Sequence, residues 1–348
     1  MHIFKFRRRR IGDDVKPFLK KSPGLKKSPA QDKILVGDVG GTNVRLGLAW
    51  RDKDGVLRVE KIEKLPGDNY ASLSAAIEEY LGKVGHAPKT AALALAGPVK
   101  NGRVSLTNRA WTVDKAKLGE RFKFQSVYLY NDFAAMARAV PECAPADFTT
   151  LNEAVADPNA PIVVAGPGTG FGMASLVPDK GGWIVLPSEG GHQAYAPQTP
   201  KETEILHILQ RDYEFVSLEL VSSGRGMDAV YQAVCTRLGQ PYHKLPPQEI
   251  RDRAVAGDRA CLDVCEIRAD AIMGAIGDMA LAIGARGGVV LAGGVAKRLL
   301  EFIDTPTAMA RYFNRGPRGD YVKTIPVKVL QKTGAALYGV AALGLAEK

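Results

Sequence analysis

Apolar residues along the chain follow two spacings, one typical of strands and one typical of helices. In the first half, short apolar or alternating runs predict strands at 34–39, 44–49, 56–62, 90–96 and 127–130. Leu73, Ala76, Ile77 and Tyr80 recur at helical spacing and predict an amphipathic helix over 72–81. A second helix is expected over 133–140, ending before Pro141. Strands and helices alternate, so the pattern favours an α/β fold.

The second half opens in the same way and then becomes mainly helical. Strands are predicted at 162–165, 171–177, 183–186 and 289–292, and helices near 201–213, 227–238, 248–256, 260–285, from about 296, and over 332–345. Gly168-Thr169 can be placed on Gly41-Thr42, with an apolar strand before and after each pair. The pattern therefore indicates a weak internal duplication of strand, Gly-Thr turn and strand.

The first of these turns has the composition of an anion site. Glycines at 40 and 41 let backbone N–H groups approach an anion closely, and Thr42 and Asn43 add side-chain donors. Asp38 would repel a phosphate held there unless a cation lay between them, so we expect it to face a hydrated Mg²⁺. The alternative is an ordinary glycine-containing hairpin with a surface acid. The second turn, at 166–170, would then bind the same polyphosphate from the other half of the chain.

Polar side chains that follow predicted strands could carry the chemistry. Asn131-Asp132, Glu189, His192 and Glu219 offer hydrogen bonds to the hydroxyls of a polyol, and carboxylates accept such bonds in charge-assisted form. Asp132 could also take the proton of a hydroxyl that attacks a phosphoryl group. These residues also have purely structural interpretations. Asn131-Asp132 could be a helix N-cap, His192 a partly buried, hydrogen-bonded histidine, and Glu219 a solvated helix residue.

Other nucleotide and catalytic motifs are absent from the sequence. It contains no G-x-x-x-x-G-K-[ST] loop and no G-x-S-x-G elbow. Residues 224–229 (GRGMDA) match G-x-G-x-x-A formally, but no early βαβ unit frames them, so we do not favour a nicotinamide cofactor. Cys261 and Cys265 lie one helical turn apart without a nearby Cys or His pair, which favours core packing over a zinc site.

Charge and composition narrow the class of protein. The chain has 348 residues, 46% of them hydrophobic, and a net charge of +10. Residues 1–33 hold eleven Lys or Arg and three Asp, so this segment carries +8 and we expect a disordered basic tail. Four cysteines without a disulfide pattern favour a reducing, cytoplasmic compartment. No apolar run reaches the roughly 20 residues that span a bilayer.

Six motifs in chain order resemble those of bacterial glucokinases. They are residues 35–45 (LVGDVGGTNVR), 107–111 (TNRAW), 131–133 (NDF), 166–172 (GPGTGFG), 188–192 (SEGGH) and 292–294 (AGG). The resemblance extends from residue 34 to about 345. Any one motif alone would be weak, whereas six in register are specific.

The resemblance implies the fold shared by hexokinases, sugar kinases and actin-like ATPases. In that α/β fold, two RNase H-like domains with mixed sheets flanked by helices stand on either side of a cleft. We expect a small domain at 34–140, joined by the C-terminal helix at about 331–348, and a large domain at 141–330. The resemblance also implies ATP-dependent phosphorylation of D-glucose at O6 and suggests a homodimer. Mg²⁺ is expected from the place of Asp38 beside the first turn, and the composition predicts a cytoplasmic protein with no membrane or specific nucleic-acid partner.

The resemblance also assigns roles to residues. Asp132 would be the general base and a sugar contact, with Asn131, Glu189, His192 and Glu219 as further sugar contacts. The phosphate and adenosine contacts would be Gly37, Asp38, Val39, Gly40, Gly41 and Thr42 in the first loop, Gly166, Gly168, Thr169 and Gly170 in the second, and Gly293 and Gly294 in the adenosine turn. Asp38 would contact Mg²⁺ through water.

The sequence departs from the family in two places, and two other functions stay open. The basic tail is extra, and the Cys-rich zinc loop of the related repressor/kinase group is absent. A kinase of another hexose, such as mannose, fructose or an N-acetylated amino sugar, would use much the same site. A sugar-responsive DNA-binding regulator on the same fold is the second alternative, prompted by the basic tail.

Overall fold

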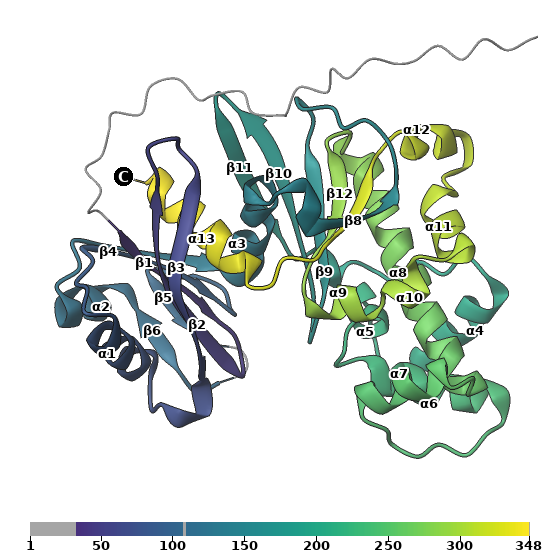
Figure 1. Ribbon diagram of the computed structural model, residues 1–348. Coiled ribbons are helices and arrows are strands. Elements are labelled where there is room, and N and C mark those ends of the chain that lie inside the picture. The colour runs from purple at the N-terminus through teal and green to yellow at the C-terminus, as the bar shows by residue number, and fades with distance from the viewer. Residues whose placement is uncertain (1–32, 107–108, 348) are drawn as a thin grey trace, which may run out of the picture.

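The computed structural model describes residues 33–106 and 109–347. The predicted basic tail, apart from Lys33, therefore lies outside the described residues, as do Thr107 and Asn108. The described chain forms two mixed sheets, one from each half, with helices on both faces of each (Figure 1). This architecture confirms the expected fold class.

The first sheet has the strand order β3-β2-β1-β4-β7. Its members are β1 (Ile34–Val39), β2 (Asn43–Arg51), β3 (Leu57–Pro66), β4 (Thr90–Leu95) and β7 (Ser126–Asn131). β1 pairs antiparallel with β2 and parallel with β4, which in turn runs parallel to β7. One face packs on α1 (Leu73–Val84), and α2 (Lys115–Phe122) follows a small hairpin of β5 (Arg103–Ser105) and β6 (Thr112–Asp114).

The second sheet repeats this order, as β11-β10-β9-β12-β13, with β8 added at the far edge. Its strands are β8 (Phe148–Asn152), β9 (Ile162–Pro167), β10 (Phe171–Asp179), β11 (Gly182–Ser188), β12 (Gly288–Leu291) and β13 (Val327–Leu330). In both sheets three consecutive strands, β1–β3 and β9–β11, form an antiparallel meander, and two further strands run parallel to the first strand of that meander. The weak duplication predicted from the Gly-Thr turns is therefore present in the topology.

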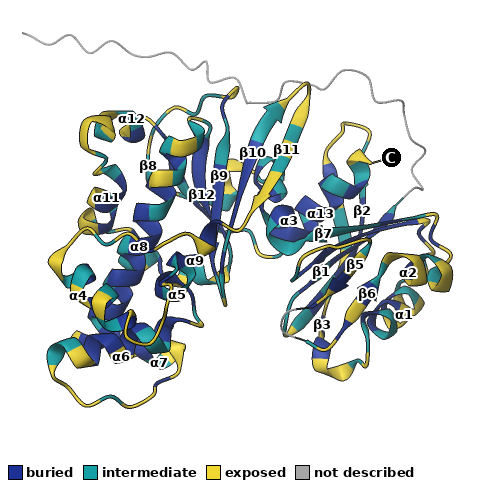
Figure 2. Cartoon of the chain, turned by 180° about the vertical axis from the view of Figure 1, so that it is seen from behind, coloured by how far each residue is buried: buried dark blue, intermediate teal, exposed yellow. Residues whose placement is uncertain are grey.

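Helices cover the outer face of the second sheet. They are α4 (Pro200–Leu209), α5 (Leu218–Ser222), α6 (Met227–Leu238), α7 (Pro247–Val255), α8 (Arg259–Ile283), α9 (Gly294–Arg298), α10 (Leu300–Ile303), α11 (Pro306–Phe313) and α12 (Gly319–Lys323). The long helix α8 is the most buried of these and packs on the sheet (Figure 2). Cys261 and Cys265 are free thiols inside this core, as the core-packing interpretation expected.

The helices that close the two halves cross between the sheets. α3 (Asp132–Ala139) follows β7 of the first sheet, yet Ala137 and Ala139 pack into the core of the second sheet with Val164 and Ala174. α13 (Ala335–Ala346) follows β13 of the second sheet, yet Leu337 packs with the first sheet. The two crossed helices lie between the sheets in Figure 1. The expected placement of the C-terminal helix with the small domain agrees with this contact, and the exact domain bounds stay a prediction.

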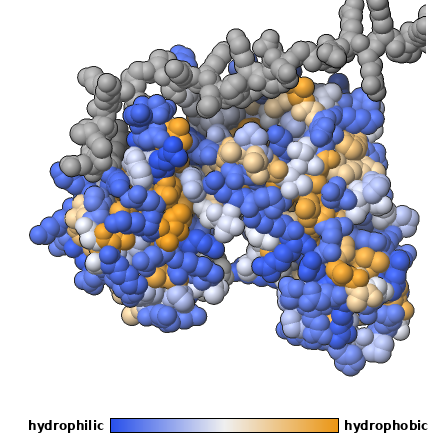
Figure 3. Space-filling view, viewed as in Figure 1, coloured by the Kyte–Doolittle hydropathy of each residue, from blue (hydrophilic) through white to orange (hydrophobic). Residues whose placement is uncertain are grey.

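The surface is notched between the two sheets. In the space-filling view, the lower parts of the two lobes stand apart (Figure 3). Across the described residues, no helix is long and apolar enough to cross a membrane.

Candidate active site

The carboxyl edge of the first sheet brings the two predicted acids together. In the sheet register, Val39 of β1 lies beside Leu95 of β4, and Leu95 lies beside Asn131 of β7. Asp38 and Asp132 therefore sit two strands apart on one edge, roughly 10 Å by strand spacing. In open α/β sheets this edge is where ligands bind.

Asn131 and Asp132 stand at the start of α3. The Oδ1 atom of Asn131 accepts the N–H groups of Phe133 (2.9 Å) and Ala134 (3.0 Å), so this residue is the helix N-cap. The structural alternative considered for this pair is therefore real, but the cap uses only the amide oxygen. The amide NH₂ of Asn131 remains a donor for a ligand. The cap also fixes Asp132 in the first turn of the helix.

Burial is the main cause that raises the pKa of Asp132, to about 6. A hydrogen bond from the Phe133 N–H opposes the rise, and the negative charge of Asp38 adds to it. A base with a pKa near 6 is ionised at neutral pH and still has more proton affinity than an exposed aspartate. The raised pKa of Asp132 thus suits general-base chemistry better than the unperturbed aspartate value of about 3.9.

Asp38 is held by a partner on the neighbouring strand. Arg45 lies opposite it in the β1–β2 register, and its Nη1 atom is 3.0 Å from Oδ2 of Asp38. Burial raises the pKa of Asp38 above its usual range, against the opposing charge and hydrogen bond of Arg45. The pair leaves one carboxylate oxygen of Asp38 available. In the described chain no group of three or more His, Cys, Asp or Glu could enclose a metal ion, and Mg²⁺ commonly uses one or two carboxylates with waters and phosphates instead.

The first glycine turn, residues 40–42, joins β1 to β2 with its amides exposed to a ligand. Gly40 donates to the carbonyl of Asn43, whereas the N–H groups of Gly41 and Thr42 donate to no acceptor within the described chain. Such unpaired donors suit an anion. Gly37 differs from the turn residues, because a Cβ there would lie 2.7 Å from the Leu93 side chain. Its glycine is explained by core packing, and a role of Gly37 or Val39 in nucleotide binding stays a prediction.

The second glycine turn, residues 168–170, is held by its carbonyl groups. The N–H groups of Gly224 and Arg225 donate to the carbonyls of Gly168 (2.9 Å) and Thr169 (3.1 Å). The dinucleotide-like glycines at 224–226 thus serve a turn that supports this loop. Gly293 and Gly294 stand at the same carboxyl edge, because Ala292 donates to Ala165 at the end of β9.

The remaining predicted residues converge on Phe171, which directly follows the second turn. Glu219 Oε2 accepts the Phe171 N–H at 2.7 Å, and a Cβ on Gly191 would lie 2.0 Å from the Phe171 carbonyl oxygen. The second contact fixes the loop that carries Glu189 and His192, both exposed and available to a ligand. Glu219 therefore supports the second turn through one oxygen, and its sugar contact stays a prediction.

Phe133 links Asp132 to the two strands that flank the second turn. A Cβ on Gly166 would lie 2.3 Å from the Phe133 ring, and one on Gly172 would lie 2.4 Å from it. Because Phe133 follows Asp132 directly, this contact sets the position of Asp132 against the second sheet. The motif Asn131-Asp132-Phe133 is visible in the sequence, but it gives no role to Phe133, because the partners of Phe133 lie more than thirty residues away.

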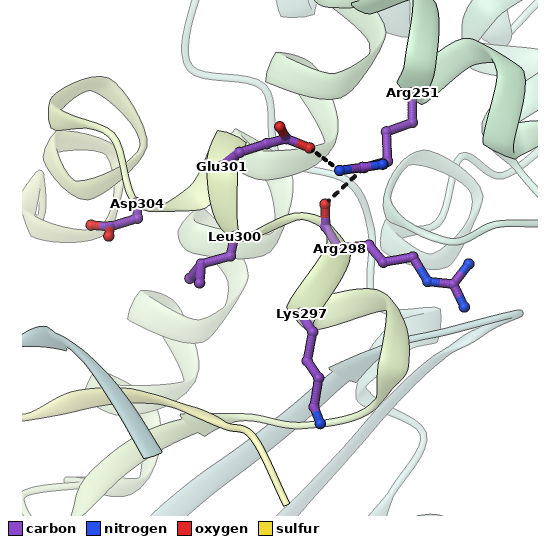
Figure 4. Close-up of a pocket in the computed structure, with 6 residues that line it drawn as sticks. All are labelled: Arg251, Lys297, Arg298, Leu300, Glu301 and Asp304. Carbon is purple, nitrogen blue, oxygen red and sulfur yellow. Dashed lines mark hydrogen bonds and ion pairs between the residues drawn. The ribbon is translucent and has the colours of Figure 1, made fainter. Parts of the chain in front are cut away.

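A separate cavity of about 400 Å³ opens beside α9 and α10. It is lined by Arg251, Lys297, Arg298, Leu300, Glu301 and Asp304 (Figure 4). Arg251 spans it, donating to the Arg298 carbonyl at 3.1 Å and pairing with Glu301 at 2.5 Å. α9 begins at Gly294, so the predicted adenosine turn and this cavity share one short helix.

Two related halves, each with a glycine turn at the edge of its sheet, and two acids on one of these edges are the features of the two-lobed sugar-kinase class. The solved glucokinase from an Antarctic psychrotroph superposes with a TM-score of 0.83 at 34% identity, covering 90% of this chain and 99% of that one. The family model described as Glucokinase matches residues 35–347. The chain therefore belongs to the glucokinase family.

Curated relatives agree with this assignment. A glucokinase of Nitrobacter hamburgensis is 36% identical over 314 residues, covering 89% of this chain and 97% of the relative. One of Caulobacter sp. (strain K31) is 38% identical over 309 residues, covering 88% and 93%. The resemblance drawn from the six motifs is thereby confirmed at the level of the family.

Proposed function

We propose that this chain transfers the γ-phosphoryl group of ATP to O6 of D-glucose, with Asp132 as general base. The membership of an ATP-dependent sugar-kinase family supports the reaction. The observation that carries the role of Asp132 is its place at the N-terminus of α3, on the sheet edge that also carries the first glycine turn, with a pKa raised to about 6.

In this mechanism the residues of the chain position and activate rather than form covalent intermediates. Asn131, Glu189, His192 and Glu219 would hold the sugar hydroxyls. The ionised Asp132 accepts the O6 proton as the bond from O6 to the γ-phosphorus forms. The bond between that phosphorus and the β,γ-bridging oxygen breaks, and ADP leaves with the electron pair.

The two glycine turns would supply the phosphate contacts. Unpaired N–H groups at Gly41 and Thr42 support this for the first turn, and the carbonyls tied back by Gly224 and Arg225 support it for the second. Asp38 would help to hold Mg²⁺, which when bound would neutralise charge on the transferring group. The buried, paired carboxylate of Asp38 suits a contact through water.

A coupled ADP-release assay across a hexose panel, with and without Mg²⁺, tests the proposal. We expect turnover with D-glucose that requires ATP and Mg²⁺. The panel should include mannose, fructose and N-acetylglucosamine, because only a few contacts of the site discriminate glucose from similar sugars. A larger kcat/KM for one of these sugars than for D-glucose would identify that sugar as the substrate instead. Absence of activity on every sugar would refute the kinase assignment.

We further propose a homodimer that works in a reducing, cytoplasmic compartment. The four free cysteines support the compartment, and the family resemblance implies the dimer. Light scattering on the purified chain would give the oligomeric state directly, and a monomeric mass across the working concentration range would contradict the dimer.

A further inference from the structure

The side chain of Arg109 lies fixed beneath the first glycine turn. Its Nη2 atom donates to the Gly41 carbonyl oxygen at 2.8 Å and pairs with Asp68 at 2.8 Å. The guanidinium stacks on the ring of Trp111, 4.6 Å from the centroid, and only 9% of the side chain is exposed. A cation buried this far on a backbone carbonyl is held in one orientation.

That contact sets the direction of the neighbouring amide. A trans peptide points its C=O and its N–H to opposite sides. Because Arg109 holds the Gly41 carbonyl, the N–H of Thr42 in the same peptide points away from Arg109. This N–H has no acceptor within the described chain. If the peptide turned over, the carbonyl would replace the donor and repel a phosphate.

We infer that Arg109 is a positioning residue for the nucleotide phosphates, acting through the Gly41–Thr42 peptide. The inference rests on the proposed function, because it takes the first turn as a phosphate site. No motif for nucleotide binding assigns this role to Arg109.

The surroundings are built to admit the guanidinium. A Cβ on Gly67 would lie 2.5 Å from Nη2 and 2.6 Å from Cζ of Arg109. The N–H of Gly67 also donates to the Thr42 carbonyl at 2.9 Å, so the Gly41 and Thr42 carbonyls both accept hydrogen bonds from outside the turn. The second turn has the same construction, with Gly224 and Arg225 as donors. In the first turn a charged side chain, that of Arg109, makes one of these contacts.

The test combines Arg109→Gln, Arg109→Lys and Gly67→Ala. Loss of a charge-assisted hydrogen bond should raise KM for MgATP about 10-fold or more in Arg109→Gln. Gly67→Ala should give a similar rise without changing Arg109 itself, because the added methyl displaces the guanidinium. Arg109→Lys keeps the charge but not the planar fork, and a smaller rise is expected. The affinity for glucose, measured by calorimetry, should stay within about twofold of wild type in all three.

Calorimetric titration with a non-hydrolysable ATP analogue gives a readout that does not depend on turnover. Its affinity should fall in parallel with the rise in KM. Gly82→Ala is the matched control, because a Cβ there meets nothing within 4 Å, and it should match wild type. Equal losses of glucose and nucleotide affinity, or unchanged nucleotide affinity in folded Arg109→Gln, would overturn the inference. An inactive wild-type enzyme would instead refute the proposed function. Should Arg109→Gln not fold, Arg109→Lys and Gly67→Ala decide.

Discussion

At the scale of single residues, the chemistry depends on the different environments of two acids, Asp38 and Asp132. Asp38 faces Arg45 at 3.0 Å, whereas Asp132 has backbone N–H groups but no cation as a partner among the described residues. Burial raises the pKa of both, and the charge of Asp38 raises that of Asp132 further. One acid is thereby suited to meet a cation and the other to accept a proton.

The pH dependence of turnover should report Asp132. Its pKa is raised to about 6, and the ionised form is the base. kcat/KM should therefore fall about tenfold per pH unit below pH 6 and level off above it. Initial rates between pH 4.5 and 8 at saturating MgATP measure this. Asp132→Asn should lower kcat by roughly 10²–10⁴-fold and remove the acidic limb. A wild-type profile flat down to pH 4.5, or near-normal turnover in the variant, would rule out Asp132 as the base.

Asp38→Ala should separate nucleotide chemistry from sugar binding. The variant removes the proposed metal contact while leaving the sugar residues in place, so ATP-dependent turnover should fall at least tenfold and glucose affinity should change little. Coupled assays and glucose calorimetry measure the two quantities. Asp54→Ala, at an exposed position of the β2–β3 connection, is the control and should behave as wild type. A loss of glucose affinity as large as the loss of turnover would place Asp38 in the sugar site instead.

At the scale of elements, close packing at glycines fixes the site. Phe133 of α3 fits over Gly166 and Gly172 of the β9–β10 hairpin, so the helix that carries Asp132 is set by the hairpin that carries the second turn. Side chains at either glycine would force the ring away. Overpacking of this kind typically costs about 1–3 kcal/mol.

Gly172→Ala should therefore lower both stability and kcat. The new Cβ would lie 2.4 Å from the Phe133 ring, and the shift of α3 displaces Asp132. We expect a Tm lower by a few degrees and a kcat lower by about tenfold, since small misplacements of a catalytic group are costly. Thermal unfolding and the ADP-release assay measure the two effects. Gly182→Ala, where a Cβ meets nothing within 4 Å, should change neither. Equal behaviour of the two variants would show that Phe133 can move freely.

How far the sequence predicts these elements depends on how clear their apolar pattern is. Most of the longer strands and helices agree with the predicted ranges to within a few residues, because each carries a clear period. The short strand β12 was also predicted, because it is a wholly apolar run that ends at glycines. β8, β13 and α5, with four or five residues each, were not predicted, and neither were α2 and α11, with eight residues each, because few apolar residues mark their buried faces. The sequence identified the candidate site residues, but it did not predict the contacts that Phe133 and Arg109 make. Those contacts join segments 30 to 70 residues apart, and only the turn glycines and the motif around Trp111 hinted at them.

At the scale of the whole molecule, the two halves are joined by exchanged helices. α3 leaves the first sheet to pack on the second, and α13 leaves the second to pack on the first. α13 is apolar on all sides, which suits a helix enclosed by protein. Because Asp132 stands at the start of α3, its position depends on the packing of α3 against both halves and against α13.

The crossing depends on the closest approach of the two helices, at Gly339. A Cβ there would lie 1.7 Å from the Ala135 carbonyl oxygen and 2.8 Å from the Ala139 backbone nitrogen, so no flexible side chain can give way. Gly339→Ala must push the helices apart. It should lower Tm by several degrees and kcat by about tenfold.

Thermal unfolding with and without glucose, beside the ADP-release assay, measures this effect. Gly119→Ala in α2 is the matched control, because a Cβ there meets only ordinary contacts, the nearest at 3.6 Å. It should leave Tm and kcat near wild type. If Gly339→Ala lost stability but kept its kcat, the crossing would hold the halves together without setting the position of Asp132. If Gly339→Ala kept both the Tm and the kcat of wild type, α3 and α13 could separate at little cost, and their close packing would not set the position of Asp132.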